Sequence, residues 1–206
     1  MKTVTALVAQ QKNKKRVNLH LDGEYFCSLD LFTVMSERLK VGDTVDEKRL
    51  KEISEKEEYA KALDKSLKLI SKTMHTKAQV IRYLKDKGYS GRTIAKVVDK
   101  LIEYGYIDDE AYAKKYFAEK SALCGARKIA YELKLKGVDE KIIDGILNGA
   151  DEQDEACERV ARKYLKGKPV DFQAKQKCYR YLLSKGFDYE TAKRAVEKLE
   201  DEDNNS

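Results

Sequence analysis

A short motif recurs three times in this chain at a constant spacing, and it constrains the fold more than any other feature. Each copy has a leucine, two further residues, Lys-Gly and then an apolar residue, and the copies contain Gly88, Gly137 and Gly186. The glycines lie 49 residues apart in both intervals. A fixed period of this length is typical of tandem repeats in which each copy is one small bundle of secondary structure.

The motif has the chemistry of a helix that ends and is followed by another helix. The lysine places a cation near the negative end of the first helix, and glycine readily adopts the left-handed conformation that ends it. The next two positions are an apolar residue, which can close a Schellman turn, and a residue that can cap the following helix. These pairs are Tyr89-Ser90, Val138-Asp139 and Phe187-Asp188.

Apolar residues recur at helical spacing on both sides of each motif, so each repeat should contain three helices. The single proline among 206 residues agrees with a mainly α fold. We predict three tandem three-helix repeats that form an elongated, curved arm. Their expected bounds are residues 59–108, 109–150 and 151–199, followed by a disordered acidic tail at 200–206.

Residues 1–58 show a different pattern, which predicts a small β-hairpin and helix module. Apolar and polar residues alternate from 16 to 21, Asp22-Gly23 is a two-residue turn signal, and residues 24 to 28 can return as a second strand. Residues 4 to 9 are a third candidate strand. One or two helices should follow. The first is short, with an apolar face of Leu31, Val34, Met35 and Leu39, and Asp46 can cap the next.

No catalytic or cofactor motif is present in the sequence, so we expect a binding protein without a cofactor rather than an enzyme. Asp108-Asp109 resembles a pair of metal-binding carboxylates, but we interpret it as a helix cap. A tyrosine group can stack on nucleic acid bases or fill a core, and we favour the core. Its members are Tyr104, Tyr106, Tyr112 and Tyr116.

The expected compartment is the cytoplasm. No apolar run approaches the length of a membrane span, and the apolar stretch near residue 1 is too short for a signal peptide. Four widely spaced cysteines without a C-x-x-C pair indicate reduced thiols, and the two distant histidines predict no metal site.

Basic residues gather around the three glycine turns in a chain of net charge +6. Stacked repeats would align them as a stripe that suits a phosphate backbone or the groove of a filament, although an ordinary solvated lysine-rich face remains the alternative. The candidate contact residues are Lys85, Lys87, Arg92, Lys96, Arg127, Lys128, Lys134, Lys136, Arg180 and Lys185, with Lys141, Lys175 and Lys177 beside them.

Three segments resemble the RecX family of recombination regulators. They are Gly105-Tyr-Ile-Asp-Asp-Glu-Ala-Tyr-Ala-Lys-Lys-Tyr116, Gly125-Ala-Arg-Lys-Ile-Ala-Tyr-Glu-Leu-Lys-Leu-Lys-Gly-Val138, and Tyr181-Leu-Leu-Ser-Lys-Gly-Phe187. They occur in the family's order and register within residues 59–199. Residues 1–58 look like the extension that longer members carry.

The resemblance implies a function that periodicity alone does not. RecX-like proteins bind the RecA filament in DNA repair and recombination and usually inhibit its ATP hydrolysis, strand exchange and co-protease activities. The resemblance therefore implies a monomeric regulator that lies along the filament groove, with single-stranded DNA as a further contact. The alternative is a DNA-binding protein whose helix pairs act as helix-turn-helix readers.

Overall fold

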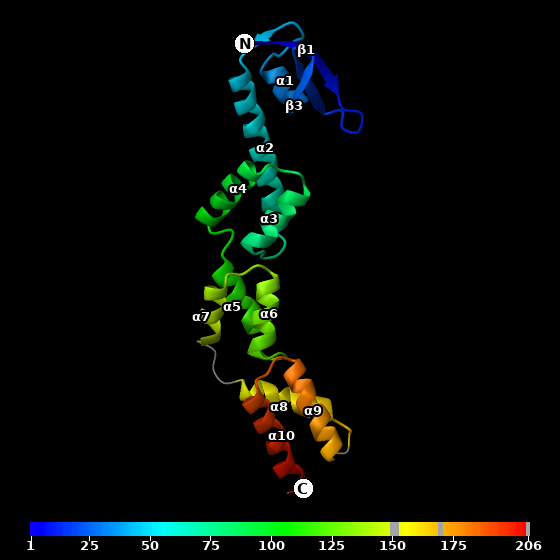
Figure 1. The fold of residues 1–206 in the computed structure, drawn as a ribbon, viewed down its shortest axis with the longest axis vertical. Helices are drawn as coiled ribbons and strands as arrows, with labels where there is room; N and C mark the ends of the chain where they lie inside the picture. The colour runs from blue at the N-terminus through cyan, green and yellow to red at the C-terminus, as the bar shows by residue number, and fades with distance from the viewer. Residues whose placement is uncertain (149–152, 169–170, 205–206) are drawn as a thin grey trace. The chain divides into compact units, whose positions relative to one another are not determined.

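The structure is a computed structural model of the chain that describes all residues except 149–152, 169–170 and 205–206, with side chains described up to residue 199. It divides into two compact units (Figure 1). The first comprises Met1–Thr73 with Tyr83–Leu101, and the second comprises Met74–Arg82 with Ile102–Ser206.

The first unit begins with a four-stranded antiparallel sheet in the order β3-β2-β1-β4. Its strands are β1 (Lys2–Ala9), β2 (Arg16–Leu21), β3 (Glu24–Asp30) and β4 (Thr44–Val45). Asp22 and Gly23 join β2 to β3 with φ values of 51° and 87°, which confirms the predicted turn. Val17, Leu19 and Leu21 are buried, as the alternation predicted, whereas the two-residue strand β4 was not predicted.

The two helices after the sheet differ from the prediction. α1 (Leu31–Ser36) ends before Leu39, and it buries Val34 but leaves Leu31 and Met35 exposed. α2 (Glu47–Ile70) is one continuous helix, so the boundary predicted at residue 58 falls inside it. Its predicted cap is confirmed, because the Asp46 carboxylate accepts the N–H of Lys48 at 3.0 Å.

The middle of α2 holds the sheet and the first repeat together through side-chain contacts. The Glu57 carboxylate accepts the backbone N–H of Asp30 at 2.8 Å, and the Lys61 ammonium lies 2.8 Å from the Asp30 carboxylate. One residue along, Glu58 accepts hydrogen bonds from both the backbone and the hydroxyl of Ser90 and from the Thr93 hydroxyl. A single helix therefore serves both the sheet and the repeat.

Three helices form each repeat, which confirms the predicted mainly α fold. The first repeat uses the C-terminal part of α2 with α3 (Lys77–Asp86) and α4 (Gly91–Glu103). The second has α5 (Asp109–Lys120), α6 (Ala126–Leu135) and α7 (Glu140–Asn148), and the third has α8 (Asp154–Leu165), α9 (Phe172–Ser184) and α10 (Tyr189–Asn204). α10 thus continues to residue 204, whereas we predicted a disordered tail from residue 200.

The repeated motif forms the same turn in all three copies. Its glycines have φ values of 79°, 80° and 88° at positions 88, 137 and 186. In each copy the N–H of the residue after glycine donates to the carbonyl of the motif leucine, at 3.2, 3.1 and 3.3 Å. This is the closing bond of a Schellman turn, so the helix ending predicted from Lys-Gly is confirmed.

Candidate partner-binding surface

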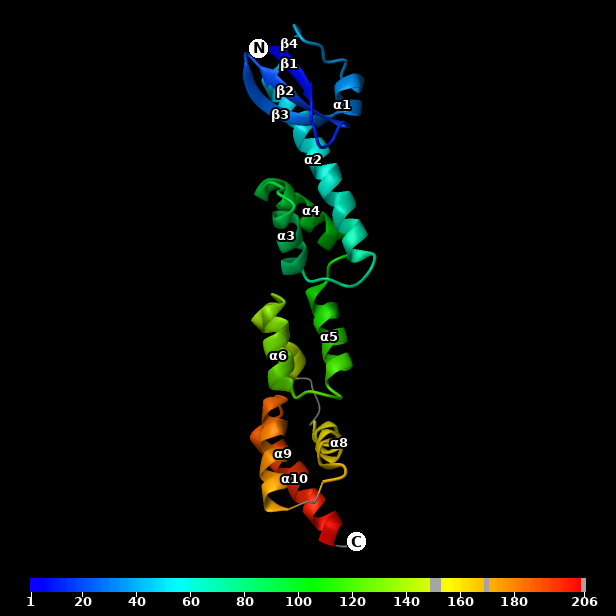
Figure 2. The same cartoon turned by 90° about the vertical axis from the view of Figure 1, so that its right-hand side faces the viewer.

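Within the second unit, the middle helices of successive repeats meet end to end. The backbone N–H of Gly125, just before α6, donates to the carbonyl of Lys185 at 3.0 Å, and that of Arg127 donates to the carbonyl of Gly186 at 3.2 Å. Figure 2 shows α6 and α9 following one another in line. Backbone groups that a helix terminus leaves unpaired are thereby satisfied, with the positive end of α6 against the negative end of α9.

The N-terminal end of α3 makes the corresponding contact with the end of α6. The Thr76 hydroxyl donates to the carbonyl of Lys136 at 2.7 Å, across 60 residues of chain. Gly125 and Lys185 are also 60 residues apart, and each lies 49 residues after its counterpart. The two junctions therefore join equivalent positions of the repeat, through a side-chain hydroxyl in one and backbone N–H groups in the other.

The aspartate pair at the start of α5 caps two helices. Asp108 caps α5 by accepting the N–H of Ala111 at 2.9 Å, as predicted. Asp109, however, accepts the N–H of Lys77 at 2.7 Å and so caps α3. Burial, together with the negative charge of Asp108, raises the pKa of Asp109, and the contacts with Lys77 offset this only in part.

Close approach at these junctions requires glycine at two of the turns. A Cβ added to Gly137 would lie 2.3 Å from the Cβ of Ala78, and one added to Gly186 would lie 2.4 Å from the backbone nitrogen of Lys128. No such neighbour lies within 4 Å of Gly88. The structure thus separates two turns that join repeats from a third turn that only ends a helix.

The motif lysine of each repeat lies over a tyrosine ring. The Nζ atoms of Lys87, Lys136 and Lys185 lie 5.5, 5.1 and 5.1 Å from the ring centroids of Tyr83, Tyr116 and Tyr181. A cation–π contact of this kind holds the lysine stem against the bundle and leaves its charge near the surface. The ring belongs to the same helix as the lysine at Tyr83 and Tyr181, whereas Tyr116 comes from the neighbouring helix α5.

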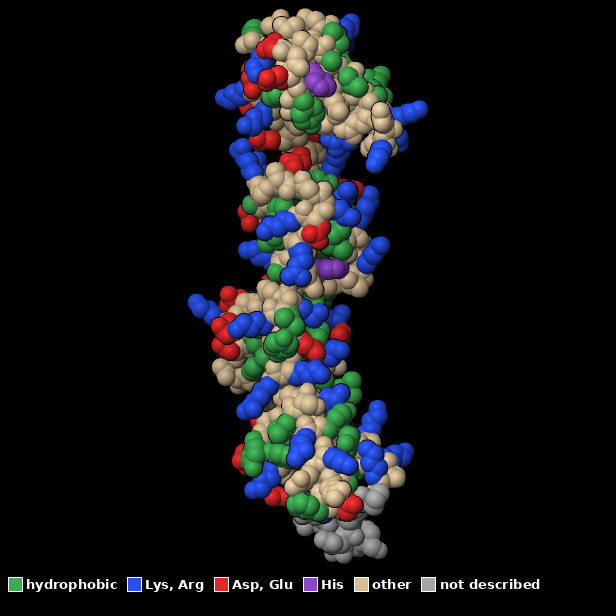
Figure 3. Space-filling view, turned by 45° about the vertical axis from the view of Figure 1, so that its right-hand side comes forward, with side chains coloured by type: hydrophobic (Ala, Val, Ile, Leu, Met, Phe, Trp, Pro, Cys, Tyr) green, Lys and Arg blue, Asp and Glu red, His purple; other side chains and the backbone are tan. Residues whose placement is uncertain are grey.

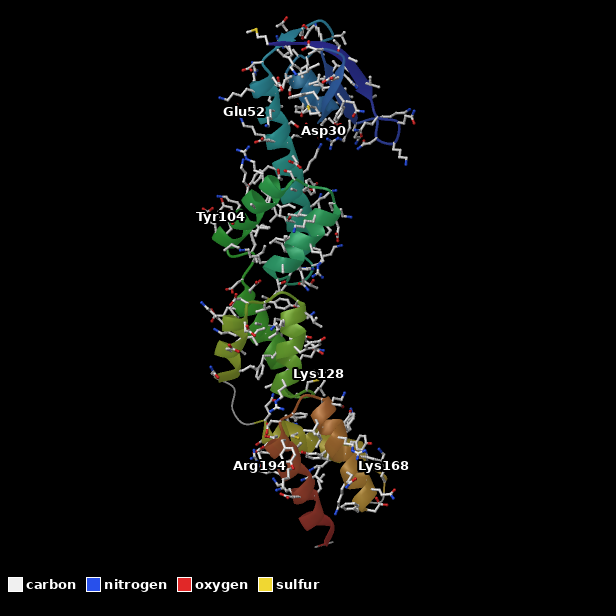
Figure 4. All side chains as sticks on the ribbon, viewed as in Figure 1. Asp30, Glu52, Tyr104, Lys128, Lys168 and Arg194 are labelled. Atoms are coloured by element: carbon white, nitrogen blue, oxygen red, sulfur yellow. The ribbon has the colours of Figure 1, made fainter. Side chains whose placement is uncertain are left out.

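The remaining candidate residues differ in their surroundings. Arg92 and Lys134 form exposed ion pairs with Glu55 and Glu140 at 3.1 and 3.2 Å, contacts worth at most about 1 kcal/mol. Lys85, Lys96, Arg127 and Arg180 are exposed. Lys128 is half-buried where α6 meets the third repeat (Figure 4). Acidic side chains stand among the basic ones on the face drawn in Figure 3.

Two of the four tyrosines that we assigned to the core are at the surface. Tyr104 and Tyr106 are 60% and 57% exposed, and their rings meet edge to face with centroids 6.3 Å apart. They flank Gly105 between two helices, outside the helical spacing that identifies core positions. Tyr112 and Tyr116 do pack against the hydrophobic core of the second repeat, and the Tyr116 hydroxyl donates a hydrogen bond to the Glu132 carboxylate at 2.5 Å.

The residues that the structure describes contain no group of three His, Cys, Asp or Glu side chains suited to a metal ion. Within the same residues, no helix combines the length and the apolar character that a membrane span needs. The four cysteines are unpaired, with Cys157 and Cys178 buried.

Comparison with known proteins identifies the family. Models of the RecX N-terminal domain and of the first, second and third RecX three-helix domains match residues 2–46, 62–101, 108–147 and 151–196. Regulatory protein RecX of Clostridium tetani is 38% identical over 95% of this chain and 94% of its own length. The chain belongs to the RecX family. RecX of Clostridium botulinum strain Alaska E43 is 34% identical over 96% of both chains.

Solved RecX structures show the same fold. A crystal structure of regulatory protein RecX aligns with a TM-score of 0.67 and 26% identity, over 96% of this chain and 100% of that one. RecX from Lactobacillus salivarius aligns with a TM-score of 0.65 and 24% identity, over 69% of this chain and 97% of that one. The match to the RecX N-terminal domain model ends at residue 46, just before α2 begins.

Proposed function

We propose that this RecX family member binds the RecA nucleoprotein filament and inhibits its ATP hydrolysis, strand exchange and co-protease activities. The supporting observation is the match to proteins named regulatory protein RecX along nearly the whole chain. No step of this function needs a catalytic residue or cofactor in the regulator. The protein acts as a monomer in the cytoplasm by occupying sites on the filament.

The repeated construction suits a partner that is itself repetitive. Each bundle presents a motif lysine at the same position in its turn, and in each bundle a tyrosine ring lies beneath it, from α5 in the second repeat and from the lysine's own helix in the other two. A filament offers the same surface at regular intervals, so like-built bundles can make like contacts with successive subunits. Arg92 and Lys134 can leave their exposed acidic partners at little cost when a partner carboxylate or phosphate replaces them.

A titration of the protein into RecA on single-stranded DNA tests the proposal directly. RecA-catalysed ATP hydrolysis is followed at saturating ATP while the regulator is added from far below to above the RecA concentration. We expect inhibition at substoichiometric amounts, because each bound regulator affects several subunits. Unchanged hydrolysis up to equimolar protein would refute the proposal.

A matched pair of variants tests the basic surface of the second repeat. Arg127 is exposed on the first turn of α6, so Arg127→Glu should raise the concentration for half-inhibition about fivefold, equivalent to about 1 kcal/mol. Lys163→Glu, an exposed position on α8 outside the candidate set, makes the same charge change as a control. Equal effects of the two variants would show that only overall charge matters.

The structure gives less support to duplex reading by helix-turn-helix pairs. A recognition helix places its N-terminal residues against the bases. The helices that follow the second and third turns instead begin with the carboxylates of Asp139, Glu140, Asp188 and Glu190. These groups repel the phosphates of a duplex. Salt-sensitive binding of duplex DNA in the absence of RecA would instead favour the helix-turn-helix function.

A further inference from the structure

The short helix α1 in the first unit leaves most of its large apolar side chains exposed. Leu31, Phe32 and Met35 are 44%, 81% and 68% exposed, and we call these three residues the α1 face. Val41, shortly after the helix, is 61% exposed, whereas Val34 is the buried residue of the helix. Neighbouring exposed apolar groups of this size are typical of a surface that contacts an apolar partner.

Cations flank both ends of the α1 face. The β1–β2 loop meets the start of the helix, where the N–H of Leu31 donates to the carbonyl of Lys15 at 2.8 Å. The turn that ends the helix carries two further basic residues. Five exposed cations therefore belong to these two segments, and none of their side chains has an ion pair or hydrogen bond with a residue that the structure describes. They are Lys12, Lys14, Lys15, Arg38 and Lys40.

The carboxylates next to α1 do not neutralise these cations. Asp30 and Glu37, at the two ends of the helix, form ion pairs of 2.8 and 2.9 Å with basic side chains of α2 (Figure 4). The Asp43 carboxylate accepts a backbone N–H at 2.7 Å. An excess of positive charge remains around the α1 face, so a partner of this surface should be anionic.

Arg38 occupies a backbone position at which glycine would be less strained. Its φ is 54°, and the N–H groups of Arg38 and Leu39 donate to the carbonyls of Met35 and Val34 at 3.1 and 3.0 Å. This is the Schellman turn that each repeat forms with glycine, which adopts the left-handed conformation without the strain of a side chain. The turn therefore does not explain the guanidinium, whose charge adds to that of the lysines around α1.

The residue types around α1 favour a lipid surface over a protein or a nucleic acid. Four of the five cations are lysines, and protein interfaces are depleted in lysine but enriched in arginine. Stacking on nucleic acid bases uses aromatic rings, whereas Leu31 and Met35 are aliphatic. An anionic bilayer accommodates both kinds of group, because its headgroups attract cations and its acyl chains take up apolar side chains.

We propose that the α1 face binds the surface of an anionic phospholipid bilayer, with Phe32 and Met35 inserted at the boundary of headgroups and acyl chains. The flanking cations bind lipid phosphates on either side. The combination of exposed apolar side chains with cations that have no described partner carries this assignment. Within the described residues no helix is suited to span a membrane, so the contact is peripheral and reversible. The site lies outside the three repeats and goes beyond the proposed function.

Co-sedimentation of the full chain with lipid vesicles tests the proposal. Vesicles of phosphatidylcholine with about one third phosphatidylglycerol should bind the chain about tenfold more strongly than pure phosphatidylcholine, and added salt should weaken this binding. Phe32→Ser should weaken binding to the anionic vesicles about tenfold, and Lys14→Glu about fivefold. Both side chains are exposed, so circular dichroism should show an unchanged helix content.

A fluorescent reporter locates the inserted residue. The chain contains no tryptophan, so Phe32→Trp introduces a single fluorophore into the α1 face. Its emission should shift to shorter wavelength when the anionic vesicles are added, and lipids brominated in their acyl chains should quench it. Phe172→Trp, at a position 74% exposed on α9, should show neither effect. Equal shifts and equal quenching at the two positions would overturn the assignment.

Two control variants match the substitutions in residue type and charge. Phe172→Ser removes an exposed phenylalanine from α9, and Lys163→Glu reverses an exposed charge on α8. Both should leave the affinity for anionic vesicles within about twofold of wild type. The proposal is wrong if the wild-type chain does not bind these vesicles, or if Phe32→Ser binds them as well as wild type, since charge alone then accounts for the contact. The assay contains no RecA, so its result does not depend on the proposed function.

Discussion

Alanine substitutions at three glycines of the second unit separate the two physical roles of glycine in this fold. Gly105 has a φ of 69° with no neighbour within 4 Å of an added Cβ. Gly125 has an ordinary φ of −73°, but its added Cβ would lie 2.1 Å from the backbone nitrogen of Phe187. Gly186 combines both features, with a φ of 88° and the backbone of Lys128 at 2.4 Å.

The expected losses of stability follow from these geometries. Gly105→Ala should cost about 1–2 kcal/mol, because an L-residue is strained in the left-handed region. Gly125→Ala forces backbone apart and weakens the two hydrogen bonds between α6 and the third repeat, which together should cost about 2–4 kcal/mol. Gly186→Ala adds strain to the same clash and should cost about 3–6 kcal/mol, and Gly137→Val should be similarly damaging.

Guanidinium unfolding followed by circular dichroism at 222 nm measures these losses. The denaturant concentration at the transition midpoint should decrease least for Gly105→Ala, more for Gly125→Ala and most for Gly186→Ala. The slope of the unfolding free energy against denaturant should stay similar. Since all three positions belong to the second unit, its own transition supplies a common reference. If Gly105→Ala were as damaging as Gly186→Ala, the close contact between repeats would contribute nothing, and our account of the junction would be wrong.

Two further predictions concern titratable groups. Burial raises the pKa of Cys157 to about 12 and that of Cys178 to about 11, so iodoacetamide at pH 8 should modify neither in the folded chain, and mass spectrometry would locate the label. Burial also raises the pKa of Glu58, but hydrogen bonds from Thr93 and Ser90 outweigh it and leave the pKa low. Its contribution to stability is therefore present above the usual carboxyl pKa and lost as the pH falls through the lowered value. Glu58→Gln should reduce the acid sensitivity of the first unit in thermal unfolding from pH 6 to pH 3, and an unchanged pH dependence would refute the assignment.

The sequence predicted features whose physical causes lie within a few residues. The Schellman turn needs only a left-handed Gly137 and a hydrogen bond from the N–H of Val138 to the carbonyl of Leu133. All three residues lie in one short segment of the sequence. The caps at Asp46 and Asp139 likewise act on N–H groups two residues ahead. Local interactions of this kind can be predicted from the order of neighbouring residues.

Features that depend on distant partners were not predicted. Asp109 follows a local capping pattern, yet its carboxylate reaches Lys77 in another repeat. α2 continues through residue 58, and two adjacent residues of this one helix, Glu57 and Glu58, contact the sheet and the first repeat. The α1 face becomes a candidate membrane site only when the β1–β2 loop is placed at its start. In each case the feature depends on residues that are far apart in the sequence and become neighbours only in the folded chain.

The end-to-end junctions explain why α6 tolerates no insertion or deletion. α6 is held at its start by the carbonyls of Lys185 and Gly186 and at its end by the hydroxyl of Thr76. One residue inserted into α6 would rotate everything beyond it by about 100° and move it by about 1.5 Å. Such a change would break the contact at one end of the helix or the other. The Schellman turn has a fixed geometry and could not compensate for the shift. The fixed length of α6 is therefore a consequence of a helix that must meet its neighbours at both ends, rather than only a record of duplication.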